Sequence, residues 1–233
     1  DQRGHGESDQ PQGERDYTFE AVVGDLHAFI QALGLEHPVV VGHSWGGNVA
    51  LQYAADHPEV PSALVLVDGG FLELALSPGM TWERTLELMT PPNFTGTTRE
   101  QFLREASHRQ LASVWSPQVA EIVLSCFRIG EDDSMTPRLH IENHLRILRA
   151  LWEQSPSQMY HRIACPVLII PAHQENPTSE RAAQLNAHKE MVVAMAEQRL
   201  PRSQTVWMKD TVHDVPVHRP RELAEAIARF SGA

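Results

Sequence analysis

The sequence predicts an α/β protein in which helices cover both faces of a mostly parallel sheet, with a helical insertion in the middle of the chain. Near both ends, short apolar runs alternate with longer stretches of helical periodicity. Between them, residues 71–160 show helical patterns separated by Pro- and Gly-containing breaks, and no strand signal. At 233 residues with 42% hydrophobic content, the chain can bury one sizeable core.

The elements of the first part follow from this alternation. Residues 1–16 are polar and rich in Gly, which is typical of a loop. Helical spacing and β-branched runs then predict, in order, a helix at 18–33, a strand at 39–41, a helix at 45–56 and a strand at 63–67.

The insertion and the last part are predicted in the same way. Helical segments are expected at 80–90, 98–113, 117–129 and 138–153, followed by a strand at 166–170, a helix at 179–199, a strand at 204–208 and a helix at 221–230. The helix at 179–199 mixes charges at helical spacing, which is typical of a solvated surface helix. The predicted domains are a core of residues 1–70 and 161–233 and a helical cap of residues 71–160.

Charge and composition disfavour several classes of protein. The net charge of −11 argues against nucleic acid as the main partner, because Lys and Arg are needed to neutralise phosphates. No apolar run approaches the ~20 residues that a membrane-spanning helix needs. Cys126 and Cys165 lie far apart and form no metal or redox motif. We expect a cytoplasmic protein, with a signal peptide before Asp1 left open because the chain starts inside a motif.

The strongest chemical signal is Gly42-His43-Ser44-Trp45-Gly46, which matches G-x-S-x-G between a predicted strand and a predicted helix. In this setting the serine occupies a strained turn, and the glycines let neighbouring backbone approach closely. The turn would lift the Ser44 hydroxyl clear of the sheet, and the Trp45 N–H would point at a developing oxyanion. The alternative is a Gly-rich turn with an incidental serine.

A serine hydroxyl needs a base, and thirteen histidines compete for that role. His213 stands out because it follows the last predicted strand and precedes the last helix. Loops at this edge of a parallel sheet are where such folds place their catalytic groups. His218 lies nearer the helix and is expected at the surface. His43 adjoins Ser44 in sequence, so its side chain should point away from Ser44.

Three segments together resemble the α/β-hydrolase-fold serine hydrolases: "DQRGHGESD" is similar to the family's D-x-R-G-x-G-x-S segment, "GHSWGG" to its nucleophile elbow, and "VHDVPVHRPRELAEAIARF" to its histidine loop and final helix. The resemblance covers nearly the whole chain except the insertion, which would correspond to the cap or lid. It implies an esterase- or lipase-like enzyme with the chain order Ser, acid, His. A serine rather than an aspartate at position 44 argues against the epoxide hydrolase and haloalkane dehalogenase branches.

The resemblance leaves the acid open between Asp68 and Glu175. The family often carries it as G-x-x-D after the strand that follows the lid, where this sequence reads "PVLIIPAHQENP". Ala172 then replaces the glycine and Glu175 the aspartate. Some members carry the acid after an earlier strand instead, where Asp68 ends "ALVLVDGG". Either carboxylate could hold the imidazole of His213 in the required tautomer.

The resemblance also implies that the chain begins after the family's first strands. The second oxyanion donor, often in an H-G loop, would then lie upstream of Asp1. The core would be incomplete at its N-terminus and would leave an unpaired sheet edge.

Several side chains are candidates for substrate binding, namely His43, Phe71, Leu72, Met80 and Trp82. The apolar ones could line an acyl pocket, and packing inside the cap is the alternative for each. The segment "HIENH" at 140–144 places two histidines on one helical face, but no third ligand is singled out, so no metal site is predicted. No cofactor is implied.

The predicted function is hydrolysis of a carboxylic ester or related acyl bond in a small apolar substrate, through a Ser-His-acid triad and an acyl-enzyme. Acyl transfer, or C–C or amide cleavage on the same triad, is an alternative. A non-catalytic, ligand-binding member of the fold is another. The identity of the substrate and the oligomeric state stay open.

Overall fold

The computed structural model describes residues 1–177 and 179–232, which divide into two compact units. The sheet unit comprises Phe19–Thr81 and Leu151–Ala233. The small unit comprises Asp1–Thr18 and Trp82–Ala150. Each unit has its own secondary structure.

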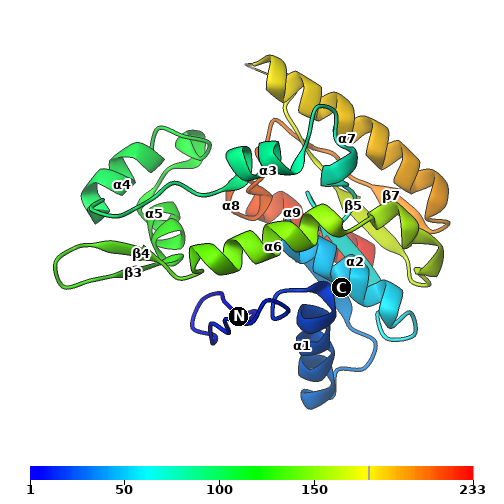
Figure 1. Cartoon of the computed structure of the whole chain (residues 1–233). Helices are drawn as coiled ribbons and strands as arrows, with labels where there is room; N and C mark the ends of the chain where they lie inside the picture. The colour runs from blue at the N-terminus through cyan, green and yellow to red at the C-terminus, as the bar shows by residue number, and fades with distance from the viewer. Residues whose placement is uncertain (178, 233) are drawn as a thin grey trace. The chain divides into compact units, whose positions relative to one another are not determined.

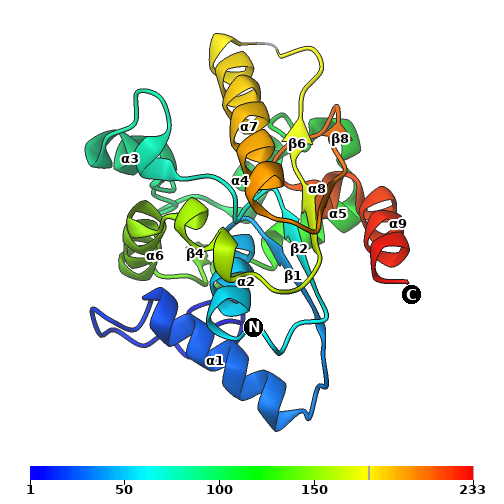
Figure 2. The same cartoon turned by 90° about the vertical axis from the view of Figure 1, so that its right-hand side faces the viewer.

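A four-stranded parallel sheet forms the centre of the sheet unit (Figures 1 and 2). Its strand order is β1 (Val39–His43), β2 (Ala63–Val67), β5 (Val167–Ile170) and β7 (Ser203–Thr205). A second parallel pair joins β6 (Ala172–His173) to β8 (Met208–Lys209). The strand expected at 204–208 is thus divided into β7 and β8. The parallel pairing confirms the predicted fold class.

Helices cover both faces of this sheet, as predicted. On one face α1 (Phe19–Ala32), α2 (Trp45–Asp56) and α7 (Glu180–Arg199) share a core with Leu64 and Leu66 of β2. On the other, α8 (Val215–His218) and α9 (Pro220–Ser231) pack against Val65 and Val67. Because successive strand residues point to opposite faces, all five residues of β2 are buried. Among the described strands β1 lies at the edge, and its Val39 and Val41 are exposed.

The small unit is mainly helical. Its helices are α3 (Trp82–Met89), α4 (Arg99–Ala106), α5 (Pro117–Leu124) and most of α6 (Ile141–Glu153). Short 3₁₀ turns occur along the chain at η1 (Leu74–Leu76), η2 (Ala112–Val114), η3 (Pro156–Gln158) and η4 (Tyr160–Arg162). Phe94, Phe102 and Phe127 pack edge to face or tilted in this unit, with ring centroids 4.8–5.7 Å apart.

The expectation of helix alone in this region was wrong at 117–129. The helix ends at Leu124, and β3 (Phe127–Ile129) pairs antiparallel with β4 (Met135–Pro137). The turn between them is stabilised by Asp132, whose carboxylate accepts a hydrogen bond from the Ser134 N–H at 3.1 Å. Asp133 adopts a φ of 61° there. The segment Gly-Glu-Asp-Asp-Ser at 130–134 is rich in residues that favour turns, and this was the sequence signal for a hairpin that the prediction missed.

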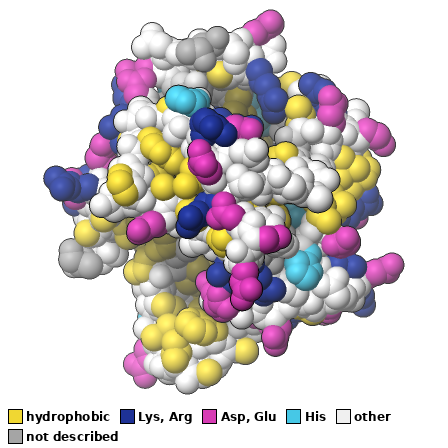
Figure 3. Space-filling view, turned by 90° about the vertical axis from the view of Figure 1, so that its left-hand side faces the viewer, with side chains coloured by type: hydrophobic (Ala, Val, Ile, Leu, Met, Phe, Trp, Pro, Cys, Tyr) yellow, Lys and Arg dark blue, Asp and Glu magenta, His cyan; other side chains and the backbone are white. Residues whose placement is uncertain are grey.

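On the face drawn in Figure 3, Lys and Arg side chains stand among Asp and Glu side chains rather than forming a continuous basic surface. Within the described residues, none of the helices combines the length and apolar character required to cross a bilayer.

Candidate active site

Ser44 lies in the turn between β1 and α2 with a backbone conformation that residues other than glycine rarely adopt. Its φ is 54° and its ψ is −124°. It occupies the N-cap of α2, yet its side chain caps no helix N–H. Its Oγ lies instead 2.7 Å from Nε2 of His213. The Ser44 hydroxyl, held in a strained turn, therefore contacts His213 instead of capping α2.

Glycines permit this turn because backbone segments touch here without side chains between them. A Cβ on Gly42 would lie 2.1 Å from the carbonyl oxygen of Gly46, and a Cβ on Gly69 would lie 2.1 Å from that of Ser44. A Cβ on Gly47 would lie 2.8 Å from the carbonyl carbon of Gly69. The elbow and the loop after β2 therefore pack backbone against backbone.

This close approach predicts that Gly69→Ala lowers the free energy of unfolding by about 3 kcal/mol, the upper end for overpacking, because the backbone of Ser44 cannot move independently. Urea denaturation followed by circular dichroism measures this. The matched control is Gly24→Ala in α1, where an added Cβ meets no atom of the described chain within 4 Å. It should gain about 0.5–1 kcal/mol from lower unfolded-chain entropy. Equal effects of the two variants would contradict the packing argument.

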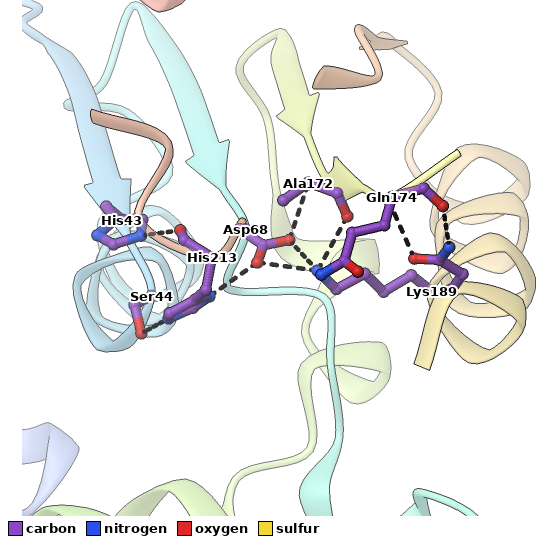
Figure 4. Close-up of polar contacts among 8 residues, drawn as sticks. His43, Ser44, Asp68, Ala172, Gln174, Lys189 and His213 are labelled. Atoms are coloured by element: carbon purple, nitrogen blue, oxygen red, sulfur yellow. Dashed lines mark hydrogen bonds and ion pairs between the residues drawn. The ribbon is translucent and has the colours of Figure 1, made fainter. Parts of the chain in front are cut away.

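The sheet brings Ser44, His213 and Asp68 together from three separate loops (Figure 4). His213 follows β8, and its Nδ1 lies 2.7 Å from Oδ2 of Asp68. Asp68 follows β2 with a φ of 42° and is only 2% exposed. The His213 side chain is 48% exposed, so an outside molecule can reach it. The three groups form the continuous chain of contacts that a hydroxyl, a base and an acid require.

The charge of Asp68 fixes the tautomer of His213. Burial, the largest single influence, would raise the pKa of the Asp68 carboxyl, but the bond from His213 and the charge and bonds of Lys189 outweigh it. The pKa is therefore held below its ordinary value. An ionised carboxylate only accepts, so Nδ1 carries the proton and Nε2 accepts from the Ser44 hydroxyl. Since the folded pKa is the lower one, this carboxylate stabilises the fold above its ordinary pKa, and the contribution is lost as pH falls through the lowered value.

Glu175, the other candidate acid, is not brought to His213. Its carboxylate pairs with Lys209 at 2.8 Å, and this contact lowers the pKa of Glu175. Its backbone N–H donates to Asp210. The geometry therefore favours Asp68 over Glu175 as the partner of His213.

The candidate binding residues have different surroundings. His43 points away from Ser44, as expected, and its Nε2–H donates to the carbonyl oxygen of His213 at 2.7 Å. Burial lowers the pKa of His43, which favours its neutral form. Phe71 is buried in the core, and Leu72 packs against that core. Met80 is half-buried in the sheet unit.

Two tryptophans complete the predicted set. Trp82 belongs to the small unit, where the guanidinium of Arg149 lies 5.1 Å from the centre of its indole ring. Trp45 is the first residue of α2, and its ring centroid lies 4.7 Å from that of Phe19. The backbone of Trp45 therefore begins the helix directly after Ser44, the position expected for an oxyanion donor.

Sequence reasoning missed the residues that hold Asp68 in place. Lys189 lies on α7, which was expected to be a solvated helix, but α7 has a buried stripe of Lys189, Val192, Val193 and Ala196. Their spacing of three and four residues was the available signal, because a lysine on an apolar stripe needs a partner. Asn48 of α2 supports the same loop by accepting from the Gly70 N–H at 3.0 Å.

A parallel sheet between two layers of helices, with a serine at a strained strand-to-helix turn, is the arrangement that defines the α/β hydrolases. Residues 1–198 match the family model described as alpha/beta hydrolase fold. The chain belongs to this family. That finding confirms the resemblance seen in the sequence.

Individual relatives match different shares of the chain. "Putative carbamate hydrolase RutD" of Escherichia coli O157:H7 is 42% identical over 187 residues, which cover 75% of this chain and 62% of that protein. "Epoxide hydrolase 1" of Caenorhabditis elegans is 40% identical over 65 residues, 28% of this chain and 16% of that protein. The chain spans less than two thirds of the length of these curated relatives.

Solved structures share the fold. A crystal structure of E-2-(acetamidomethylene)succinate hydrolase matches with a TM-score of 0.73 and 22% identity, covering 100% of this chain and 80% of that chain. At that identity the likeness supports the fold alone.

Proposed function

We propose that the protein is a serine hydrolase that cleaves a carboxylic ester or a related acyl bond, with Ser44, His213 and Asp68 as its catalytic triad. The observation that supports this most strongly is the pair of 2.7 Å contacts that join the three side chains. Membership of the α/β-hydrolase family supports it independently. In the same proposal, residues 71–160 form the cap domain, and residues 1–70 and 161–233 form the core domain.

The proposed reaction has two stages. His213 Nε2 accepts the hydroxyl proton while Ser44 Oγ attacks the acyl carbon, and the imidazolium then protonates the departing alcohol. Water next attacks the acyl-enzyme and gives one proton to His213, which passes it to Ser44 Oγ as the acyl–oxygen bond breaks and the acid leaves. Asp68 stabilises the imidazolium through Nδ1, and the Trp45 N–H donates to the oxyanion. Leu72 and Met80, which are half-buried, would contact the acyl group, while His43 would hold the histidine loop.

Two relatives suggest other bonds. A nitrogen leaving group, as in a carbamate or amide, is the second candidate, because the relative with broad coverage is named a carbamate hydrolase. Epoxide opening is disfavoured by the chemistry of Ser44. Attack of an alkoxide on an epoxide gives an ether, and an ether lacks the carbonyl group at which water releases an acyl-enzyme.

A covalent probe tests the proposal directly. A fluorophosphonate should label the protein once, and digestion followed by mass spectrometry should locate the adduct on the peptide that contains Ser44. Ser77→Ala is the matched control, because Ser77 Oγ also contacts a histidine, His188 Nε2, at 3.1 Å. No described residue accepts from Nδ1 of His188. Ser77→Ala should therefore keep full labelling, and an adduct elsewhere than Ser44 would contradict the assignment.

A further inference from the structure

The ammonium group of Lys189 is buried beside the candidate acid. Its side chain is 7% exposed, and that of Asp68 is 1% exposed. Lys189 Nζ lies 2.6 Å from Oδ1 and 2.9 Å from Oδ2 of Asp68, and 3.0 Å from the carbonyl oxygen of Ala172 (Figure 4). An ammonium group has three N–H donors, so these contacts use all of them.

Asp68 is held by partners from three elements. Oδ1 accepts from Lys189 and from the Ala172 N–H at 2.9 Å, while Oδ2 accepts from Lys189 and from His213. Ala172 thus fixes the acid through its N–H and the lysine through its carbonyl oxygen. Ala172 lies in the segment where the family often carries its acid. Here this segment instead holds Asp68, which follows β2.

We propose that Lys189 is a positioning residue for the triad: its charge and hydrogen bonds keep Asp68 ionised and oriented toward His213, and its removal changes the pH dependence of activity. This rests on the proposed serine hydrolase function. A lone buried carboxylate would hold the imidazolium proton more tightly. Lys189 offsets one unit of that negative charge without touching the reacting atoms.

Other ionisable groups lie around this network. His43 and Asp214 lie on the side of His213, His188 adjoins Lys189 on α7, and His173 pairs with Glu190 at 3.0 Å. All of them remain in variants at position 189. A change in pH dependence there therefore reports the loss of the Lys189 charge.

The test is the pH profile of kcat/KM for an activated ester. In Lys189→Met the acidic limb should move upward by about one pH unit, because removing a positive charge raises the pH at which the shared Asp68–His213 proton leaves. Lys189→Gln, which keeps hydrogen bonds but no charge, should shift the limb equally, and KM should change less than kcat. The control is Lys209→Met, the only other lysine, which is 69% exposed and should keep the original profile. An unshifted limb in folded Lys189→Met overturns the proposal.

A second measurement covers failure of the variants to fold. In the wild-type protein labelled with ¹⁵N-lysine, two Nζ signals are expected, and the Lys189 signal alone should move over the pH range in which His213 titrates. A Lys189 signal insensitive to that range overturns the proposal. If the wild-type protein hydrolyses no ester and takes up no fluorophosphonate, the serine hydrolase function fails. The lysine signal would still decide whether Lys189 is coupled to His213.

Discussion

Ser44→Ala should lower kcat for ester hydrolysis by about 10⁶-fold, the loss typical of removing a serine nucleophile. The methyl group of alanine offers no oxygen for attack, and His213 is left without a proton to accept. The stopped-flow or long-incubation rate with an activated ester measures this loss, with protein concentration fixed by absorbance. Folding should be nearly unchanged, since Ser44 caps no helix N–H.

A double variant separates catalysis by the triad from the smaller contributions of substrate binding and the oxyanion donor. Because Ser44 and His213 act as one unit, Ser44→Ala combined with His213→Ala should be no slower than Ser44→Ala alone. Residual hydrolysis would then come from substrate binding and the oxyanion donor. Multiplicative losses, or a rate in Ser44→Ala within tenfold of the wild type, would mean that another group is the nucleophile.

The local sequence pattern was sufficient to predict the core elements and two residues of the candidate site, Ser44 and His213, which the structure places in contact. The predicted helix at 45–56 and strand at 63–67 coincide with α2 and β2. Ser44 and His213 were identified because each follows a strand and precedes a helix in a recognisable motif. Such signals lie within a few neighbouring residues, and the physical causes of a strained turn lie there too.

The partners of His213 could not be chosen in this way because they depend on pairing between distant segments. Asp68 is oriented by its N–H bond to Ile170 and by the hydrogen bond from Ala172, more than one hundred residues away. Glu175 has an equally suitable carboxylate in the sequence, and only the folded structure separates the two, since Asp68 contacts His213 whereas Glu175 pairs with Lys209. The short β3 strand was missed for a related reason, since three residues carry too little periodicity to be distinguished from a helix end.

The contrast between the two carboxylates predicts the second large effect: Asp68→Asn should lower kcat by about 10⁴-fold, whereas Glu175→Gln should stay within about twofold. Asparagine can donate as well as accept, so the tautomer of His213 with Nδ1 protonated is no longer enforced, and the imidazolium loses its counter-charge. The comparison uses steady-state rates divided by the concentration of protein that reacts with fluorophosphonate. A large loss in Glu175→Gln with little in Asp68→Asn would reverse the assignment.

The same substitution should destabilise the fold, because Asp68→Asn leaves the buried Lys189 charge without its carboxylate. Removing one partner of a buried pair costs about 3–5 kcal/mol. Asp68→Asn with Lys189→Met removes both charges, so it should recover most of that stability in urea denaturation while the rate stays low. Recovery of stability without recovery of rate would show that the two deficits have separate origins: an unpaired buried charge lowers stability, and the missing carboxylate beside His213 lowers the rate. Recovery of both would mean that Asp68 acts only as the counter-ion of Lys189 and has no part in the triad.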